Sequence, residues 1–187
     1  LSPATAGDDE VRIRPTLVGV CGTDLELVAG YYPFTGVLGH EFVGIVEQGP
    51  GEWLGRKVVG DINASCGHCP SCREGRANHC PNRTVLGIVG RDGCFADSFL
   101  LPATNLLEVP QHVPDECSVF TEPLAAAMRV LEQVDFVPGD RWLIVGDGRL
   151  GQLVARVVAA TSVDLTVVGR HERKLALLDG RGIKVTE

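Results

Sequence analysis

A cluster of four cysteines constrains the folding of this chain more than any other stretch. CGHCPSCREGRANHC, residues 66–80, carries four of the seven cysteines, with two, two and seven residues between them. Three explanations are open at this point. The cluster could be a disulfide staple, a metal centre, or a module that reads nucleic acid.

Charge and cysteine chemistry decide among these explanations. The net charge of -7 opposes binding to a phosphate backbone, because counterion release needs clustered lysine and arginine. The N-terminal sequence LSPATAGDDE lacks the basic and apolar regions of a signal peptide, and no apolar run reaches the roughly 18–20 residues of a membrane span. We therefore expect a cytoplasmic protein with reduced thiols and with no nucleic-acid or membrane partner.

Reduced thiols at this spacing predict structural zinc. Four thiolates can surround a tetrahedral ion at about 2.3 Å each, and CxxC turns bring neighbouring ligands to one centre. An iron–sulfur cluster fits less well, because the spacing matches neither common ferredoxin pattern. Since four thiolates fill a tetrahedron, His68 and His79 are expected to be ordinary loop residues. The predicted ligands are Cys66, Cys69, Cys72 and Cys80.

A closed four-cysteine site performs no chemistry, so a catalytic centre must come from other residues. GVCGTD (19–24) and GHEFVG (39–44) each place one possible ligand between glycines, namely Cys21 and His40. Together they could supply two ligands of an open zinc site, whose fourth position takes substrate or water. The candidates for the third ligand are Glu122 in FTEPLAAAM, which fits best, and Glu41, Cys94 and Cys117.

A glycine-rich stretch predicts a dinucleotide site. RWLIVGDGRLGQLVARVVAA (141–160) runs from an apolar strand through a GxGxxG turn into a helix with apolar spacing. In such a unit the pyrophosphate rests on amides at the helix N-terminus. DLTVVG, HERKLALLDGRG and IKV then complete a β-α-β-α-β order. The residues predicted to line the cofactor site are Gly146, Gly148, Leu150 and Gly151.

The preceding part of the chain is typical of an irregular, largely antiparallel β domain. Short strand-like stretches at 10–20, 41–49, 55–62 and 95–102 alternate with Gly, Pro and Asp turns. Helices are expected over 24–30 and, between the domains, over 123–134. We predict an α/β protein with a β domain over residues 1–121 and a linker helix with a nucleotide-binding unit over 122–187.

The order of these motifs resembles the medium-chain, zinc-dependent alcohol dehydrogenase family. GVCGTD, GHEFVG, the four-cysteine lobe, FTEP and VGDGRLG follow one another as in that family, across nearly the whole chain. The resemblance implies a GroES-like β domain followed by the first half of a doubly wound Rossmann domain. It also implies that the chain is a fragment, inactive alone, of a homo-oligomeric enzyme.

The resemblance implies a second, catalytic zinc ion. Cys21, His40 and Glu122 would be its ligands, with Glu41 a near or alternating ligand. Asp24 would hold the ring of His40 and so fix its tautomer. Glutamate at position 122, where many alcohol dehydrogenases carry cysteine, resembles the polyol, threonine and sugar dehydrogenase branches.

The implied reaction is hydride transfer between an alcohol and a nicotinamide cofactor, with zinc as the Lewis acid. The substrate would be a secondary alcohol, a polyol or an amino alcohol, or the corresponding carbonyl compound. Thr23 is the expected first proton acceptor. Many relatives end the proton relay with a histidine just beyond this threonine, where this chain has Glu26.

The sequence after the second strand of the nucleotide-binding unit favours NADP over NAD. An NAD-specific unit usually places Asp or Glu there to bind the ribose 2′-hydroxyl, and this chain reads VVGRHERK. Gly169 removes the carboxylate, and Arg170 offers a guanidinium that could bind a 2′-phosphate. His171 and Lys174 could add positive charge.

Two other functions stay open from the sequence. One is a zinc-stabilised binding module that kept the fold without the chemistry. The other is a quinone reductase-like member of the same superfamily, which would lack both the ligand set and the cysteine lobe. Metal content separates the quinone reductase-like enzyme from the alcohol dehydrogenase, and the candidate ligands of an open metal site argue against the binding module.

Overall fold

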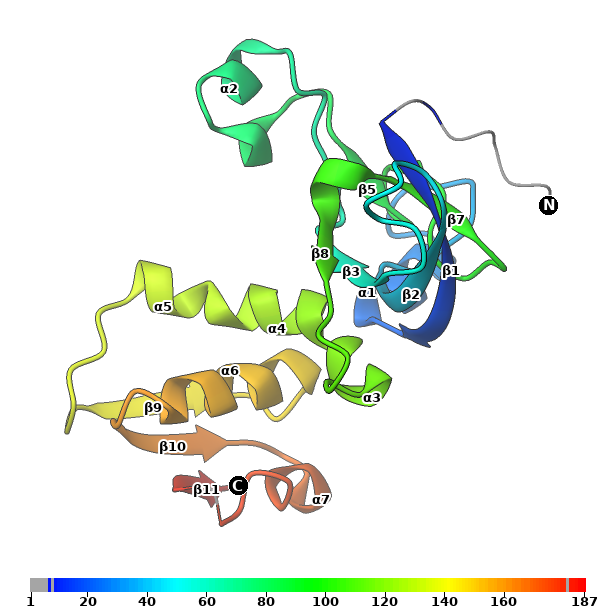
Figure 1. Ribbon diagram of the computed structural model, residues 1–187. Helices are drawn as coiled ribbons and strands as arrows, with labels where there is room; N and C mark the ends of the chain where they lie inside the picture. Colours follow the sequence, from blue (N-terminus) through cyan, green and yellow to red (C-terminus); the bar gives the residue numbers. More distant parts are fainter. Residues whose placement is uncertain (1–6, 8, 181) are drawn as a thin grey trace. The chain divides into compact units, whose positions relative to one another are not determined.

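The computed structural model describes residues 7, 9–180 and 182–187, which fall into two compact units. The first unit ends at Glu122 and the second begins at Pro123 (Figure 1). Residues 1–6 and 8, most of the stretch judged for a signal peptide, lie outside the described part. Within that part, each helix is too short or too polar to cross a bilayer.

The first unit is built on a five-stranded sheet with the order β7-β1-β2-β3-β8, whose neighbouring strands are all antiparallel. Apolar side chains alternate inward along its strands and form a core that includes Ile13, Phe42 and Leu101. The predicted strand over 95–102 begins only at Phe99. The strand bounds are β1 Glu10–Gly19, β2 Glu41–Gln48, β3 Lys57–Gly60, β7 Phe99–Pro102 and β8 Leu106–Glu108.

Smaller elements of the first unit frame the cysteine lobe and one end of the large sheet. Figure 1 shows the lobe, with its helix α2, projecting away from the sheet. A second, three-stranded sheet has the order β4-β5-β6. In the sequence, β4 precedes the lobe and β5 follows it. These elements are β4 Asn63–Ala64, α2 Pro70–Arg73, η1 Ala77–His79, β5 Thr84–Leu86, β6 Gly90–Arg91 and η2 Ala103–Asn105. Two short helices, α1 Gly22–Val28 and α3 Asp115–Ser118, complete the unit before α4.

The second unit contains a parallel sheet with the order β11-β10-β9. Ala155 and Val158 of the helix after β9 pack with Leu165 and Val167 of β10, as the apolar spacing of that helix predicts. This arrangement is the first half of a doubly wound Rossmann domain. The elements are β9 Arg141–Val145, α6 Arg149–Ala159, β10 Asp164–Val168, α7 Glu172–Leu175 and β11 Ile183–Thr186.

Three helices differ from the sequence-based expectation. The helix expected over 24–30 lies two residues earlier, as α1 Gly22–Val28. The helix expected over 123–134 begins earlier and is interrupted, as α4 Thr121–Met128 and α5 Val130–Gln133. The helix expected after β10 ends at Leu175 and continues as turns in which each amide bonds three residues back, such as Leu178 N to Leu175 O at 2.9 Å. The tighter turns put residues three positions apart on one side, and this lets both Leu175 and Leu178 pack into the core.

Candidate active site

The register of β1 and β2 brings two distant motifs together. Gly19, the last residue of β1, is paired with Glu41, the first residue of β2. Cys21 follows Gly19 by two residues at the start of α1, and His40 immediately precedes Glu41. The two predicted ligands, nineteen positions apart, therefore meet at one end of the sheet.

Three possible metal ligands gather at this end of the sheet. One donor atom from each of Cys21, His40 and Glu41 lies within 4.8 Å of the others. Gly19 makes room for the carboxylate, since a Cβ there would come within 2.2 Å of Glu41 Oε2. A side chain at position 19 would push Glu41 out of the set. We call Cys21, His40 and Glu41 the open set.

Asp24 contacts two members of the open set, Cys21 and His40. Its Oδ2 accepts a hydrogen bond from the Cys21 amide at 2.8 Å, and its Oδ1 lies 3.3 Å from His40 Nδ1. Asp24 and His40 are both almost completely buried, with 2% and 3% of their surfaces exposed. The 3.3 Å contact falls outside hydrogen-bond geometry, so Asp24 Oδ1 and His40 Nδ1 are buried polar atoms without a hydrogen-bond partner in the described part of the chain.

The open set fits a zinc ion. A thiolate, an imidazole and a carboxylate are the donor types that open zinc sites use, and a fourth position would stay free. A metal-bound histidine usually presents its other ring nitrogen to a carboxylate, which is the position that Asp24 takes behind His40. The two unsatisfied buried atoms face each other at 3.3 Å, so a small rotation of the His40 ring would let Nδ1–H donate to Asp24 Oδ1 and leave Nε2 for a metal.

Glu122, at the start of α4, lies near the carboxylates of Glu41 and Asp24 but does not belong to the open set. Burial, followed by the charges of Glu41, Asp61 and Asp24, raises the pKa of Glu122 to about 7. Burial is thus the largest cause of this raised pKa, and three neighbouring carboxylates add to it. A divalent cation bound among these groups would lower that pKa.

Of the remaining residues considered for the catalytic centre, some lie beside the open set and others are exposed to solvent. Thr23 Oγ1 lies 3.7 Å from Cys21 Sγ, next to the open set, whereas Glu26 is exposed. Cys94 is buried, its thiol lies 3.6 Å from the Glu41 carbonyl oxygen, and burial raises its pKa to about 12. Cys117 is exposed. Neither cysteine belongs to the groups that could hold a metal among the described residues.

The cysteine lobe forms a second, closed set. The Sγ atoms of Cys69 and Cys72 are 3.5 Å apart, those of Cys69 and Cys80 are 3.8 Å apart, and those of Cys80 and Cys66 are 3.5 Å apart. The edge of a tetrahedron with zinc–sulfur bonds of 2.3 Å is about 3.8 Å. A disulfide would need a separation of about 2 Å. The four thiols are therefore arranged as ligands of one ion.

Two thiols of the lobe have pKa values shifted in opposite directions. A hydrogen bond from the His68 backbone lowers the pKa of Cys66 to about 6. A backbone hydrogen bond from Cys72 lowers the pKa of Cys69, but burial and the neighbouring thiols outweigh it and raise that pKa to about 11. One thiol therefore ionises more readily than its neighbour, because hydrogen bonds favour its thiolate.

The glycine turn of the second unit joins β9 to α6. Gly146 has a φ of +125°, and a Cβ on Gly151 would lie 2.4 Å from Gly146 O, so both positions require glycine. The space beside Gly148 is open, since a Cβ there would meet no atom within 4 Å. This leaves room for a phosphate beside the first amides of α6. Leu150 is exposed. The turn fits a dinucleotide.

The end of β10 contains a contact that sequence reasoning did not find. Gly169 is buried and Arg170 is exposed. Asp147, from the glycine turn, accepts hydrogen bonds from the amides of Arg170 and His171 and contacts the His171 ring. The only sequence signal was an acidic residue between two glycines of the turn, and its partners lie more than twenty positions away.

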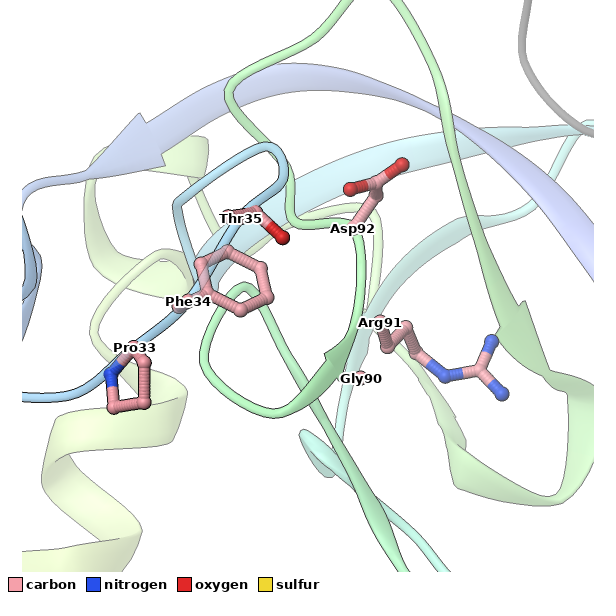
Figure 2. A pocket seen from close by; sticks show the side chains of 6 residues that line it. All are labelled: Pro33, Phe34, Thr35, Gly90, Arg91 and Asp92. Atoms are coloured by element: carbon pink, nitrogen blue, oxygen red, sulfur yellow. The ribbon is translucent and has the colours of Figure 1, made fainter.

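A separate pocket of about 440 Å³ lies elsewhere in the first unit. In Figure 2 the Arg91 guanidinium points away from Phe34. That guanidinium is held by Glu10 and Thr84, and the Asp92 carboxylate accepts a hydrogen bond from the Val37 amide. The lining residues are Pro33, Phe34, Thr35, Gly90, Arg91 and Asp92. The pocket does not include a residue of the open set.

Comparison with known proteins gives consistent matches. The family model of the alcohol dehydrogenase GroES-like domain matches residues 7–111. The chain is similar to an L-threonine 3-dehydrogenase of Deinococcus radiodurans, with 34% identity over 185 residues, covering 92% of this chain and 53% of the relative. The chain thus spans about half the length of the curated relatives that it matches.

Solved structures resemble the whole chain. A zinc-binding dehydrogenase from Sinorhizobium meliloti, bound to NADP, matches with a TM-score of 0.90 and 31% identity, covering 100% of this chain and 56% of that one. The alcohol dehydrogenase rspB of Escherichia coli, complexed with NADH, matches with a TM-score of 0.88 and 31% identity, covering 98% of this chain and 56% of that one. The matched proteins share the fold of both units.

Proposed function

Because this chain belongs to the medium-chain, zinc-dependent alcohol dehydrogenase family, we propose that its open set is the catalytic metal site of an oxidoreductase. The enzyme transfers a hydride between an alcohol and a nicotinamide cofactor. The observation that carries the proposal is the mutual approach of Cys21, His40 and Glu41, with the buried carboxylate of Asp24 behind His40. A non-catalytic binding module has no use for an open metal site beside a closed one.

Each unit has one part in the proposed reaction. A zinc ion held by the open set supplies Lewis acidity toward a hydroxyl oxygen, and a nicotinamide dinucleotide on the glycine turn supplies the hydride acceptor. Cys21 and His40 are the constant ligands. Glu41 completes the set in the present arrangement, and Glu122, with its raised pKa, is the carboxyl group that could replace or join it. The four thiols of the lobe hold a second zinc ion.

The residues around the open set position the ligands and move a proton. Asp24 fixes the imidazole of His40, which leaves Nε2 as the nitrogen available to a metal. Thr23 Oγ1, beside Cys21 Sγ, takes up the proton of the substrate hydroxyl. Glu26 lies three positions further along α1 and therefore on the same face of the helix. It passes that proton toward solvent.

The cofactor and substrate follow from the same reasoning. Arg170, exposed beside a buried glycine at the end of β10, supports NADP over NAD, since no carboxylate of residue 169 opposes a 2′-phosphate. The named relatives favour an amino alcohol within the class of secondary alcohols, polyols and amino alcohols. A four-thiolate zinc site needs reduced thiols, which supports a cytoplasmic location. We expect the whole protein to be a homo-oligomer.

The test combines metal analysis with a substrate screen on the whole protein. Elemental analysis should find two zinc ions per chain, and polyols, secondary alcohols and amino alcohols should reduce NADP faster than NAD. Arg170→Ala should bring the two cofactors to within a few fold of each other, since a charge-assisted hydrogen bond is worth about tenfold in affinity. One zinc ion and no reduction of either cofactor would indicate the binding module instead. Activity without zinc would indicate a quinone reductase-like enzyme.

A further inference from the structure

A buried aspartate stands inside the glycine turn of the second unit. Asp147 lies between Gly146 and Gly148, with only 7% of its surface exposed. A charged group this deeply buried needs hydrogen bonds or a counter-charge. The second unit supplies both from one place, the first residues after β10.

The Asp147 carboxylate accepts three N–H donors from two consecutive residues. Oδ2 accepts the amide of Arg170 at 3.0 Å and the amide of His171 at 2.7 Å. The ring nitrogen Nδ1 of His171 lies 3.0 Å from Oδ1 and 2.9 Å from Oδ2. The carboxylate therefore fixes the backbone at 170 and 171 and the ring of His171 together.

Gly169 makes this arrangement possible. A Cβ on residue 169 would come within 2.6 Å of Asp147 Cβ and within 2.7 Å of Asp147 Oδ2. Any side chain at position 169 would therefore displace the Asp147 carboxylate. An acidic side chain at position 169 and the Asp147 carboxylate would therefore compete for the same space. In this chain residue 169 is glycine, and the Asp147 carboxylate occupies that space.

Asp147 is not arranged as a reader of the ribose. A carboxylate at the end of the second strand usually accepts the ribose 2′-hydroxyl, but the oxygens of Asp147 already accept three donors of the chain itself. By contrast, Arg170 is exposed and the His171 side chain is 50% exposed. The groups that can meet a ligand are the Arg170 side chain, whose backbone amide Asp147 holds, and the His171 ring, which Asp147 contacts directly.

We propose that Asp147 is a positioning residue for cofactor specificity, which sets Arg170 and His171 to bind the 2′-phosphate of NADP. The inference rests on the proposed function, because it takes the glycine turn as the dinucleotide site. With Nδ1–H donating to Asp147, Nε2 is the outer ring nitrogen of His171, and in the protonated imidazole its N–H donates to the phosphate. Arg170 binds the same phosphate from a backbone that the carboxylate holds.

Titration calorimetry with NADP and NAD, without any alcohol substrate, tests the proposal. Wild type should bind NADP more tightly. Asp147→Asn, which keeps the shape but places an amide nitrogen among three donors, should weaken NADP binding about tenfold and NAD binding much less. The matched control is Asp179→Asn, which removes the same charge from an exposed residue of the second unit and should leave both affinities unchanged.

Two further variants distinguish a loss of NADP recognition from a folding defect. His171→Ala removes a half-exposed ring, so the fold should tolerate it, and it should lower the ratio of NADP to NAD affinity by about threefold or more. Gly169→Ala keeps all charges but displaces the carboxylate, and should lower the ratio as Asp147→Asn does.

The outcomes separate this inference from the proposed function. If Asp147→Asn or His171→Ala weakens binding of both cofactors equally, Asp147 merely maintains the turn and the inference is wrong. A ratio that rises in favour of NADP would show that Asp147 reads the ribose of NAD, which also overturns it. A folded wild type that binds neither cofactor would overturn the dinucleotide site and this inference together.

Discussion

The cysteine lobe and the open set are both groups of possible zinc ligands, but they are assembled in opposite ways. The lobe takes four identical ligands from fifteen consecutive residues, and their sulfur atoms lie 3.5 to 3.8 Å apart. The open set takes three different ligands from two strand ends, which the register of β1 and β2 brings together. The lobe needs only local turns, whereas the open set needs the whole sheet.

The two sets also differ in the groups that surround them. In the lobe the thiols themselves fill a tetrahedron, so the site is closed. Around the open set, carboxyl groups exceed the ligands needed, and burial and charge raise the pKa of Glu122 to about 7. The comparison teaches that four ligands close together in sequence can form a closed set by local turns, whereas an open set among buried carboxyl groups depends on the packing of the sheet.

The largest effect should follow from breaking the closed set. Cys66→Ser removes one of four thiolates, and we expect the lobe zinc to be lost and the free energy of unfolding to fall by about 5 kcal/mol or more, since structural zinc contributes to folding directly. Thermal unfolding with elemental analysis measures both. Cys117→Ser, an exposed thiol outside both sets, is the control. Retention of two zinc ions by the Cys66 variant would contradict the lobe assignment.

Breaking the open set should abolish turnover instead. Cys21→Ser should lower kcat/KM for alcohol oxidation at least about a thousandfold, or about 4 kcal/mol, because the Lewis acid is lost or misplaced. The zinc content should fall from two ions to one, while unfolding changes little. Near-normal turnover with one zinc ion remaining would show that the open set is not catalytic.

Loosening the open set without removing a ligand gives a smaller effect. Asp24→Asn keeps the size of the side chain but weakens the contact with His40 Nδ1. We expect zinc affinity at this site, or kcat/KM, to fall between about tenfold and a hundredfold. Competition with a chelator measures the affinity, and Asp97→Asn, an exposed aspartate of the same unit, is the control. An unchanged affinity would mean that Asp24 does not orient the ring.

The smallest effect concerns the acidic surroundings of the open set. Because the pKa of Glu122 is raised to about 7, the folded state binds this proton more tightly than the unfolded chain, so stability falls as the pH rises from the ordinary carboxyl pKa to about 7. In metal-free protein, Glu122→Gln should therefore be more stable than wild type by roughly 1 kcal/mol at about pH 8, after allowance for solvent screening, and equal at about pH 4. Urea unfolding at both pH values checks this. A variant less stable than wild type at the higher pH would contradict the crowding of charge.

Much of the fold could be predicted because its signals are local. The glycine turn, the apolar face of α6 and the parallel strand after it are all visible within thirty residues. Short elements such as β8 and α3 escaped prediction, because three or four residues carry no periodicity. The early end of α7 also escaped, since its apolar spacing suits a helix and the burial of Leu175 and Leu178 favours tighter turns.

The sequence by itself determined which ligand types each site has and in what order they come. Spacing was enough for the lobe, because Cys66, Cys69 and Cys72 are three positions apart and must lie close together, and Cys80 follows Cys72 by only eight positions. Only the tertiary structure decided that Glu41 joins Cys21 and His40 while Glu122 stays outside, and that Asp147 reaches the end of β10. The physical reason is that contacts between distant residues depend on strand register and on the room that Gly19 and Gly169 leave for a carboxylate.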